Sequence, residues 1–235
     1  MRVFEFAPET VSGDFIFSQE ESKKMRKCVM SFAVAMLLIP VCVMAQNPND
    51  GWVKIFNGKD LDGWKANEAS GEFFVNEAGE LCGKGGRSHL FYMEELQEFE
   101  LLMDIYINDK GNSGVYVLSP WVDNNWPTGG FEIQVNATHS DPVKTGSLYG
   151  IIKIFETPAP AGQWYTMHVT VKGDNLTVKI NDKVLYTYVD PTAPFAKFPN
   201  LPREFKYIGQ KGHIALQQHD PGSLPKFKNI YLKKL

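Results

Sequence analysis

The chain contains few cysteines: Cys28, Cys42 and Cys82 in 235 residues. The first two lie in an N-terminal segment that we expect to be removed. Cys82 then stands alone, and a single cysteine forms no internal disulfide. The remaining chain must be stabilised by its core, for which a hydrophobic content of 43% and an aromatic content of 13% are sufficient.

The sequence also lacks an excess of basic charge and the common nucleotide and metal motifs. The formal net charge is -3, with lysines and arginines scattered along the chain, so no nucleic-acid partner is expected. No stretch matches a P-loop, a dinucleotide-binding glycine motif, a zinc-ligand spacing or a Gly-x-Ser-x-Gly nucleophile elbow. These absences favour a function outside the nucleotide-dependent enzymes and the serine hydrolases.

The N-terminal region has the pattern of an export signal. Two basic residues follow Met25, an apolar run extends to Val43, and small residues precede Gln46. We therefore expect residues 25–45 to be a signal peptide, and residues 1–24 to be an N-terminal extension that is mis-annotated. The alternative is a genuine N-terminal tail followed by a membrane anchor.

The expected product is one exported domain over residues 46–235, in the periplasm or outside the cell, with no transmembrane span after signal removal. A lipoprotein anchor at Cys42 is less favoured, because Val41 stands where a lipobox has Gly, Ala or Ser.

Long helical stripes are missing from the mature chain, and the hydrophobic period is two. A strand, an Asn-Gly turn and a short return are predicted in "WVKIFNGKDLDGW", and at most a turn of helix in "SHLFYMEELQEF". Short strands at this spacing predict an all-β fold, a two-sheet antiparallel β-sandwich of jelly-roll type. Further strands are predicted in "FELLMDIYIN" (the longest), "SGVYVLS", "GFEIQV", "YTMHVTVKG", "LTVKIND", "KVLYTYVD", "GHIALQQH" and "FKNIYLKKL".

One strand, "GFEIQVN", places acid and amide groups opposite a hydrophobic face. Phe131, Ile133 and Val135 alternate with Glu132 and Gln134, and successive side chains of a strand point to opposite faces. The hydrophobic set is expected to fill the space between the sheets. The polar set is then expected to line a groove on the outer face of one sheet.

Two other strands show the same arrangement. Gln217 and His219 share one face of "GHIALQQH", and Asn112, Gly114 and Tyr116 share one face of "GNSGVYVL". The glycine leaves room for a ligand near the backbone. An ordinary solvated face explains any one strand, but three together favour a binding site.

Aromatic residues add a preference for sugars. Trp121 and Trp126 lie in the loop "SPWVDNNWPTGG", where indole rings can stack on sugar faces, or can cap the end of the sandwich. The other tryptophans, Trp52, Trp64 and Trp164, are expected in the core.

The remaining polar candidates have weaker assignments. His89 and Arg87 are candidate hydroxyl or anion donors at the groove. His168 is expected on the surface, and His139 in a polar loop without a supported metal role.

The pair Glu132 and Gln134 argues against an ordinary retaining glycosidase. Such enzymes use two carboxylates about 5 Å apart, one as nucleophile and one as acid. Residues two apart on one strand would meet that geometry, but the second residue here is an amide. An amide can neither attack as a carboxylate nor exchange a proton.

Several segments together resemble the 3-keto-disaccharide hydrolase domain family, which has the concanavalin A-like lectin/glucanase fold. They are "GWVKIFNGKDLDGW", "GNSGVYV", "GFEIQV", "TGSLYG", "AGQWYTMHVTVKGDNLTVKIND" and "GHIALQQHDPGSLPKFKNIYLKKL", in order from Gly51 to Leu235. The resemblance implies an exported enzyme, of a kind common in Bacteroidetes, that acts on glycosides oxidised at sugar C3. The ketone acidifies the C2 proton, and the resulting enolate expels the C1 substituent before water adds.

The resemblance also implies roles for particular residues. It implies His219 as base or acid, Glu132 as proton partner or metal ligand, and Gln134 and Gln217 as groups that orient hydroxyls. A divalent cation, calcium or manganese, would polarise the ketone. The chain departs from the family where Asn136 replaces an aspartate. A non-catalytic, lectin-type carbohydrate-binding protein therefore remains the alternative.

Overall fold

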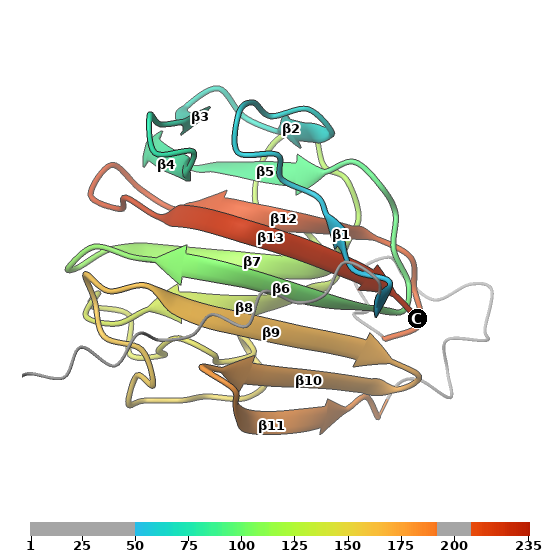
Figure 1. Ribbon diagram of the computed structural model, residues 1–235. Helices are drawn as coiled ribbons and strands as arrows, with labels where there is room; N and C mark the ends of the chain where they lie inside the picture. Colours follow the sequence, from blue (N-terminus) through green and yellow to red (C-terminus); the bar gives the residue numbers. More distant parts are fainter. Residues whose placement is uncertain (1–49, 192–207) are drawn as a thin grey trace, which may run out of the picture. The chain divides into compact units, whose positions relative to one another are not determined.

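Thirteen β-strands form two antiparallel sheets in the computed structural model, which describes residues 50–191 and 208–235 (Figure 1). The larger sheet has the order β11-β10-β9-β6-β13-β4-β3, with β1 also paired to β13, and the smaller has the order β2-β5-β12-β7-β8. The predicted two-sheet sandwich is therefore confirmed. The strands are β1 (Val53–Lys54), β2 (Trp64–Ala66), β3 (Gly71–Val75), β4 (Leu81–Gly85), β5 (Ser88–Tyr92), β6 (Phe99–Tyr106), β7 (Asn112–Ser119), β8 (Phe131–Asn136), β9 (Tyr165–Lys172), β10 (Asn175–Ile180), β11 (Lys183–Val189), β12 (His213–Gln218) and β13 (Lys226–Lys234).

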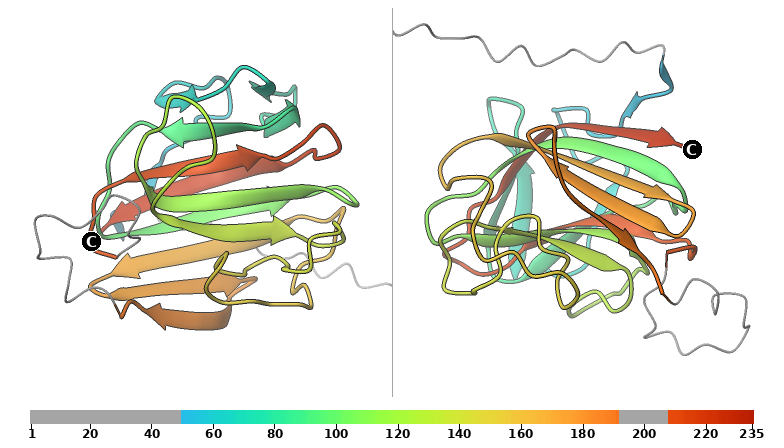
Figure 2. Two further views of the ribbon diagram at one scale, coloured as in Figure 1. Left: turned by 180° about the vertical axis from the view of Figure 1, so that it is seen from behind. Right: turned by 90° about the horizontal axis from the view of Figure 1, so that it is seen from below.

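The core lies between the two sheets and follows the alternation of the strands. Phe131, Ile133 and Val135 of β8 are buried in it, as the sequence predicts. Met167 and Val169 of β9 enter the same core from the larger sheet. Figure 2 shows the two sheets stacked face to face. The outward-facing residues of β8 are therefore held at fixed positions on the far side of the smaller sheet.

Tight turns join the strands at the edge of the larger sheet. Asn181 and Asp182, between β10 and β11, have φ values of 49° and 64°. Two successive positive φ angles characterise the type I′ turn, whose twist matches that of a two-residue hairpin. β10 and β11, which are paired, therefore form a hairpin with these two residues at its tip.

The strand–turn–return prediction for the first segment is wrong. β1 pairs with β13 and β2 pairs with β5, so the two flanking strands belong to different sheets. The intervening turn is stabilised by Asn57, whose Oδ1 accepts hydrogen bonds from the backbone N–H groups of Lys59 and Asp60. A side-chain turn of this kind reverses the chain without strand pairing.

Three strands were missed from the sequence: β3, β4 and β5. The segment predicted to hold a turn of helix begins with β5, whose side chains are mostly buried. The longest strand is β13 with 9 residues, whereas the predicted one, β6, has 8. Among the tryptophans predicted to be buried, Trp64 is buried, while Trp52 and Trp164 are half-buried.

Some predictions lie partly or wholly outside the described residues. The signal peptide and the upstream extension do so completely. Within the described part of the chain, no helix is long and apolar enough to cross a membrane.

Candidate functional site

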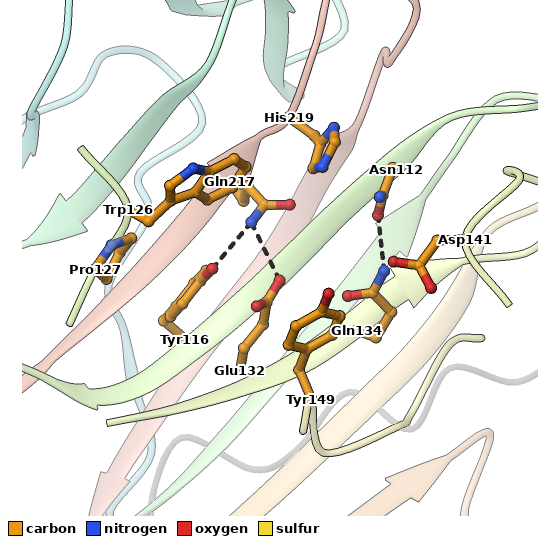
Figure 3. Close-up of a pocket in the computed structure, with 10 residues that line it drawn as sticks. All are labelled: Asn112, Tyr116, Trp126, Pro127, Glu132, Gln134, Asp141, Tyr149, Gln217 and His219. Carbon is orange, nitrogen blue, oxygen red and sulfur yellow. Dashed lines mark hydrogen bonds between the residues drawn. The ribbon is translucent and has the colours of Figure 1, made fainter. Parts of the chain in front are cut away.

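A pocket of about 280 Å³ opens on the outer face of the smaller sheet, over β12, β7 and β8 (Figure 3). Seven residues that the sequence analysis named for the site line it, together with three residues that it missed. The lining residues are Asn112, Tyr116, Trp126, Pro127, Glu132, Gln134, Asp141, Tyr149, Gln217 and His219. The structure thus brings Glu132, from the middle of the chain, and His219, from near its C-terminus, to one cavity.

Glu132 is nearly buried and sits in a hydrogen-bonded group with Tyr116 and Gln217. Gln217 Nε2 donates to Glu132 Oε1 over 3.1 Å and to the Tyr116 hydroxyl oxygen over 3.0 Å. Burial and the neighbouring Glu132 raise the pKa of Tyr116, so the phenol stays protonated. The three groups come from adjacent strands β8, β7 and β12, which fixes the orientation of the carboxylate.

Gly114 makes the position of Glu132 sterically possible. A Cβ atom on Gly114 would lie 3.0 Å from both Cγ and Cδ of Glu132, and closer still to Oε1. The two residues sit on the paired strands β7 and β8. The room left by the missing side chain is therefore filled by the glutamate, and not by a ligand as the sequence suggested.

His219 is backed by a carboxylate that the sequence analysis did not single out. Its Nδ1 lies 2.7 Å from Asp220 Oδ2, which leaves Nε2 available to a ligand. Burial of Asp220 opposes its ionisation, but hydrogen bonds from His219, Gly222 N and Ser223 Oγ lower the pKa of Asp220 below its usual value. An ionised aspartate on Nδ1 selects the tautomer in which Nε2 accepts a proton.

The amides in the pocket form a second ordered group. Gln134 Nε2 donates to Asn112 Oδ1 over 2.9 Å, and both side chains are buried. This bond uses one amide proton of Gln134 and one amide oxygen. Asn112 retains N–H donors and Gln134 an oxygen acceptor for a ligand with hydroxyl groups.

Asn136 continues the polar face of β8 but does not line the pocket. Its Nδ2 donates to the carbonyl oxygens of Asp141 and Val143, and its Oδ1 accepts from His139 N. The fully buried amide thereby folds the turn after β8 and holds Asp141 at the pocket wall.

The two loop tryptophans have different positions. Trp126 lines the pocket, with its ring centroid 5.4 Å from that of His219. Trp121 lies outside the pocket: its ring packs on Phe91 at 4.9 Å, and Lys65 Nζ lies 4.4 Å from its centroid. The prediction of sugar contact by Trp121 therefore has no support from the geometry of this pocket.

The other predicted candidates lie beside or behind the pocket. Arg87 is paired with Glu68, Nη2 to Oε1 at 2.9 Å, and its guanidinium stands over the Trp126 ring. His89 is fully buried behind Trp126. His168 is half-buried on β9 of the other sheet, bonded to Glu100, which agrees with its predicted outward position.

The missed residues come from loops without a strand pattern. Pro127, Asp141 and Tyr149 reach the pocket from the segments after β7 and β8. No periodicity marks such positions. Asp220 could have been found, because it directly follows His219 and a carboxylate beside an imidazole is a familiar proton-transfer pair.

The described residues contain no cluster of three or more His, Cys, Asp or Glu side chains placed to share a metal ion. The Glu132 carboxylate already accepts the hydrogen bond from Gln217. The role of Glu132 as a ligand of a divalent cation therefore stays a prediction.

The family model for the 3-keto-alpha-glucoside-1,2-lyase-like domain matches residues 51–233. The chain belongs to this family. The resemblance inferred from the sequence is therefore confirmed over nearly all of the predicted domain. Among curated proteins, none matches the chain.

Solved structures agree with the fold. A protein of Parabacteroides distasonis ATCC 8503, provisionally named a glycosyl hydrolase, is 24% identical, with a TM-score of 0.67 over 80% of this chain and 95% of its own. The carbohydrate-binding module CBM66 of Bacillus subtilis is 16% identical, with a TM-score of 0.54 over 73% and 96%. The Bacillus licheniformis beta-glucanase is 10% identical, with a TM-score of 0.52 over 78% and 97%. At these identities the likeness concerns the fold alone.

Proposed function

We propose that this protein binds a glycoside oxidised at C3 of one sugar ring and cleaves it by removing the C2 proton. The observation that carries the proposal is the Asp220–His219 pair facing the same small pocket as the buried Glu132. The family supports a carbohydrate-active enzyme of this class. The pocket volume of about 280 Å³ is small for a drug-sized ligand and suits a single sugar ring.

His219 is the proposed base. With Nδ1 held by Asp220, its Nε2 takes the proton from C2, and the electrons of that C–H bond form the enolate with the C3 ketone. The enolate then expels the C1 oxygen, leaving a double bond between C1 and C2. C2 and the glycosidic oxygen are both bonded to C1, so His219 lies close to both. The proton that it takes from C2 is therefore available for the departing oxygen.

The polar groups opposite His219 bind and orient the ring. The amide N–H groups of Asn112 donate to ligand oxygen atoms, among them the oxygen on which negative charge develops. Glu132, fixed by Gln217, accepts hydrogen bonds from ligand hydroxyls and acts as proton partner when water adds to C1. These steps need no carboxylate nucleophile and none is routed through a metal ion.

The test is release of aglycone from 3-keto-glucosides by the wild type and by His219→Ala, each with and without a chelator. We expect wild-type release and a loss of about 10²–10⁴-fold in the variant. Unchanged release by His219→Ala would sink the assignment. The chelator arm tests the calcium or manganese prediction, and a strong loss of release on chelation would support a bound cation.

A lectin-type carbohydrate-binding protein is the second candidate. It is favoured by Trp126, which offers an aromatic surface at 38% exposure beside the pocket amides. This function needs only stacking and hydrogen bonding. Calorimetry and the aglycone-release assay distinguish the two functions. Sugar binding without aglycone release from any substrate of a 3-keto-glycoside panel would favour the lectin-type protein.

We also propose export of the domain, to the periplasm or beyond, after removal of residues 25–45. The support is the basic and apolar pattern of that segment. N-terminal sequencing of the mature protein from its host checks this, with Gln46 as the expected first residue.

A further inference from the structure

A buried histidine lies directly behind the pocket on the same face of the smaller sheet. His89 of β5 is opposite Gln217 of β12 in the strand register. Residues opposite each other in an antiparallel pair project from the same face. His89 therefore belongs to the polar surface that carries the pocket, although its side chain is fully buried.

Two aromatic rings enclose His89. Tyr116 lies edge-on to it, with ring centroids 5.3 Å apart, and Trp126 lies 5.4 Å away at an interplanar angle of 69°. Within residues 50–191 and 208–235, neither ring nitrogen of His89 has a hydrogen-bond partner, and the same is true of Gln217 Oε1. Each such buried polar atom destabilises the fold, because its hydrogen bonds to water are lost without replacement. Two facing residues that both leave polar atoms unpaired therefore point to a ligand.

The charge state of His89 indicates which ligand group fits. Burial lowers the pKa of His89 to about 4, so the ring is neutral near pH 7. A neutral imidazole has one N–H donor and one nitrogen acceptor, and the neighbouring Gln217 oxygen adds an acceptor. A hydroxyl group both donates and accepts, and carries no charge to desolvate. Burial disfavours a carboxylate or phosphate here, since the nearby Arg87 is already paired with Glu68.

Trp126 covers this position from the solvent side. It lies in the segment 121–130, which has no regular secondary structure, and its side chain is 38% exposed. Backbone contacts anchor the loop at the preceding residue: Asn67 Nδ2 donates to Asn125 O over 3.1 Å, and Asn125 N donates to Glu68. With the backbone held, uncovering His89 beside the pocket requires the indole side chain to move, and not the loop.

We propose that a subsite lies under Trp126, between His89 and Gln217, and that it takes one uncharged hydroxyl group of a sugar bound in the pocket. The proposal rests on carbohydrate binding at this site, as in the proposed function, but not on turnover. The indole then covers the subsite whether or not a hydroxyl occupies it. His89 forms a hydrogen bond with one hydroxyl of the ligand.

The test uses methyl α-glucoside and its 2-, 3-, 4- and 6-deoxy analogues, with affinities measured by calorimetry on the wild type and His89→Phe. These sugars carry no ketone, so the result is independent of catalysis. We expect one deoxy analogue to bind the wild type about tenfold more weakly than the parent. In His89→Phe the parent and that analogue should bind equally.

His168→Phe is the matched control, because it makes the same change on the other sheet, where the ring bonds Glu100. It should keep the wild-type pattern. An unchanged pattern in His89→Phe, or no binding of any sugar in the panel, overturns the subsite. Loss of aglycone release with the deoxy pattern intact would instead contradict only the catalytic proposal.

A second measurement needs no variant at this position. The protein is wild type with ¹⁵N-labelled histidine rings. Because its pKa is about 4, the His89 ring should still show the ¹⁵N chemical shifts of a neutral imidazole at about pH 5. Saturating methyl α-glucoside should shift them. If these resonances do not move while the sugar binds, the buried ring does not contact the ligand and the proposal fails.

Discussion

The outer faces of the two sheets have the same strand alternation but different surroundings. On the larger sheet, polar residues of β6 and β9 pair with each other at partial exposure, as in Glu100 with His168 at 2.8 Å and Asp104 with Thr166 at 2.8 Å. On the smaller sheet, the polar residues of β7, β8 and β12 are buried. In Figure 2 the loops after β7 and β8 lie on the side of the smaller sheet.

These loops make the difference between a solvated surface and a site. They remove water from carboxylate and amide groups that the strands would otherwise present to solvent, and electrostatic interactions strengthen where water is excluded. A polar face is thus common to both sheets, while the pocket over β12, β7 and β8 forms where loop residues such as Trp126 and Tyr149 close over the smaller sheet.

The strongest test of this comparison is Glu132→Gln on the covered face. We expect formation of the free 3-keto sugar from a 3-keto-glucoside to fall by about 10²–10⁴-fold, because the amide cannot accept a proton when water adds to C1. Steady-state kinetics give the value, and thermal unfolding confirms that the variant is folded. Activity within twofold of the wild type would show that the buried carboxylate has no part in the reaction.

Gly114→Ala should have the next largest effect, and it should lower the stability of the fold as well as the activity. The added Cβ overlaps Glu132, so the free energy of unfolding should fall by about 1–3 kcal/mol. The measurement is urea unfolding of both single variants and of the double variant Gly114→Ala/Glu132→Ala. The double variant should recover much of the loss, since the overlapping atoms are gone. Additive losses would contradict the steric explanation.

Asp220→Asn tests the backing of His219 and its dependence on pH. We expect activity to fall on the order of tenfold or more, because the neutral amide no longer selects the reactive tautomer. The lowered pKa of Asp220 means that the folded state binds this proton more weakly than the unfolded state. Its stabilisation is present above the ordinary aspartate pKa of 3.8 and is lost as the pH falls through the lower folded value.

Unfolding titrations of the wild type and Asp220→Asn between about pH 7 and pH 2 check that sign. The wild type should lose stability more steeply than the variant below about pH 4. Parallel curves would mean that the hydrogen bonds to Asp220 do not favour its ionised form.

Glu100→Gln should have the smallest effect, and it is the matched control for Glu132→Gln. It removes the partner of His168 on the open face, so the free energy of unfolding should change by less than about 1 kcal/mol. Formation of the free 3-keto sugar should not change. A large loss of either property would show that the two outer faces do not differ as described.

Strand alternation predicted much of the site, because side-chain direction in a strand follows from backbone geometry alone. The outward positions of Glu132, Gln134 and Gln217 and the inward positions of Phe131 and Ile133 were predictable in this way. These side chains meet in one pocket because β12, β7 and β8 are neighbours in the sheet. The alternation within each strand does not predict this order. The family resemblance supplied the fold that implies it.

The loops were not predictable, since their conformation depends on specific tertiary contacts. Trp121 and Trp126 lie in one loop of similar composition, yet only Trp126 faces the pocket, because Asn125 is tied to Asn67 and Glu68. The strands β3 and β4 were missed because glycines such as Gly83 and Gly85 interrupt the apolar alternation.

The buried amide of Asn136 has a practical consequence for production of the protein. Asn136-Ala137-Thr138 and Asn175-Leu176-Thr177 both match the acceptor pattern for N-linked glycans. In the folded protein the Asn136 nitrogen is enclosed and donates two hydrogen bonds, whereas Asn175 is exposed at the start of β10. A eukaryotic expression host acting on the folded domain would therefore attach a glycan at Asn175. Attachment at Asn136 would have to precede folding and would disrupt the turn that carries the pocket wall.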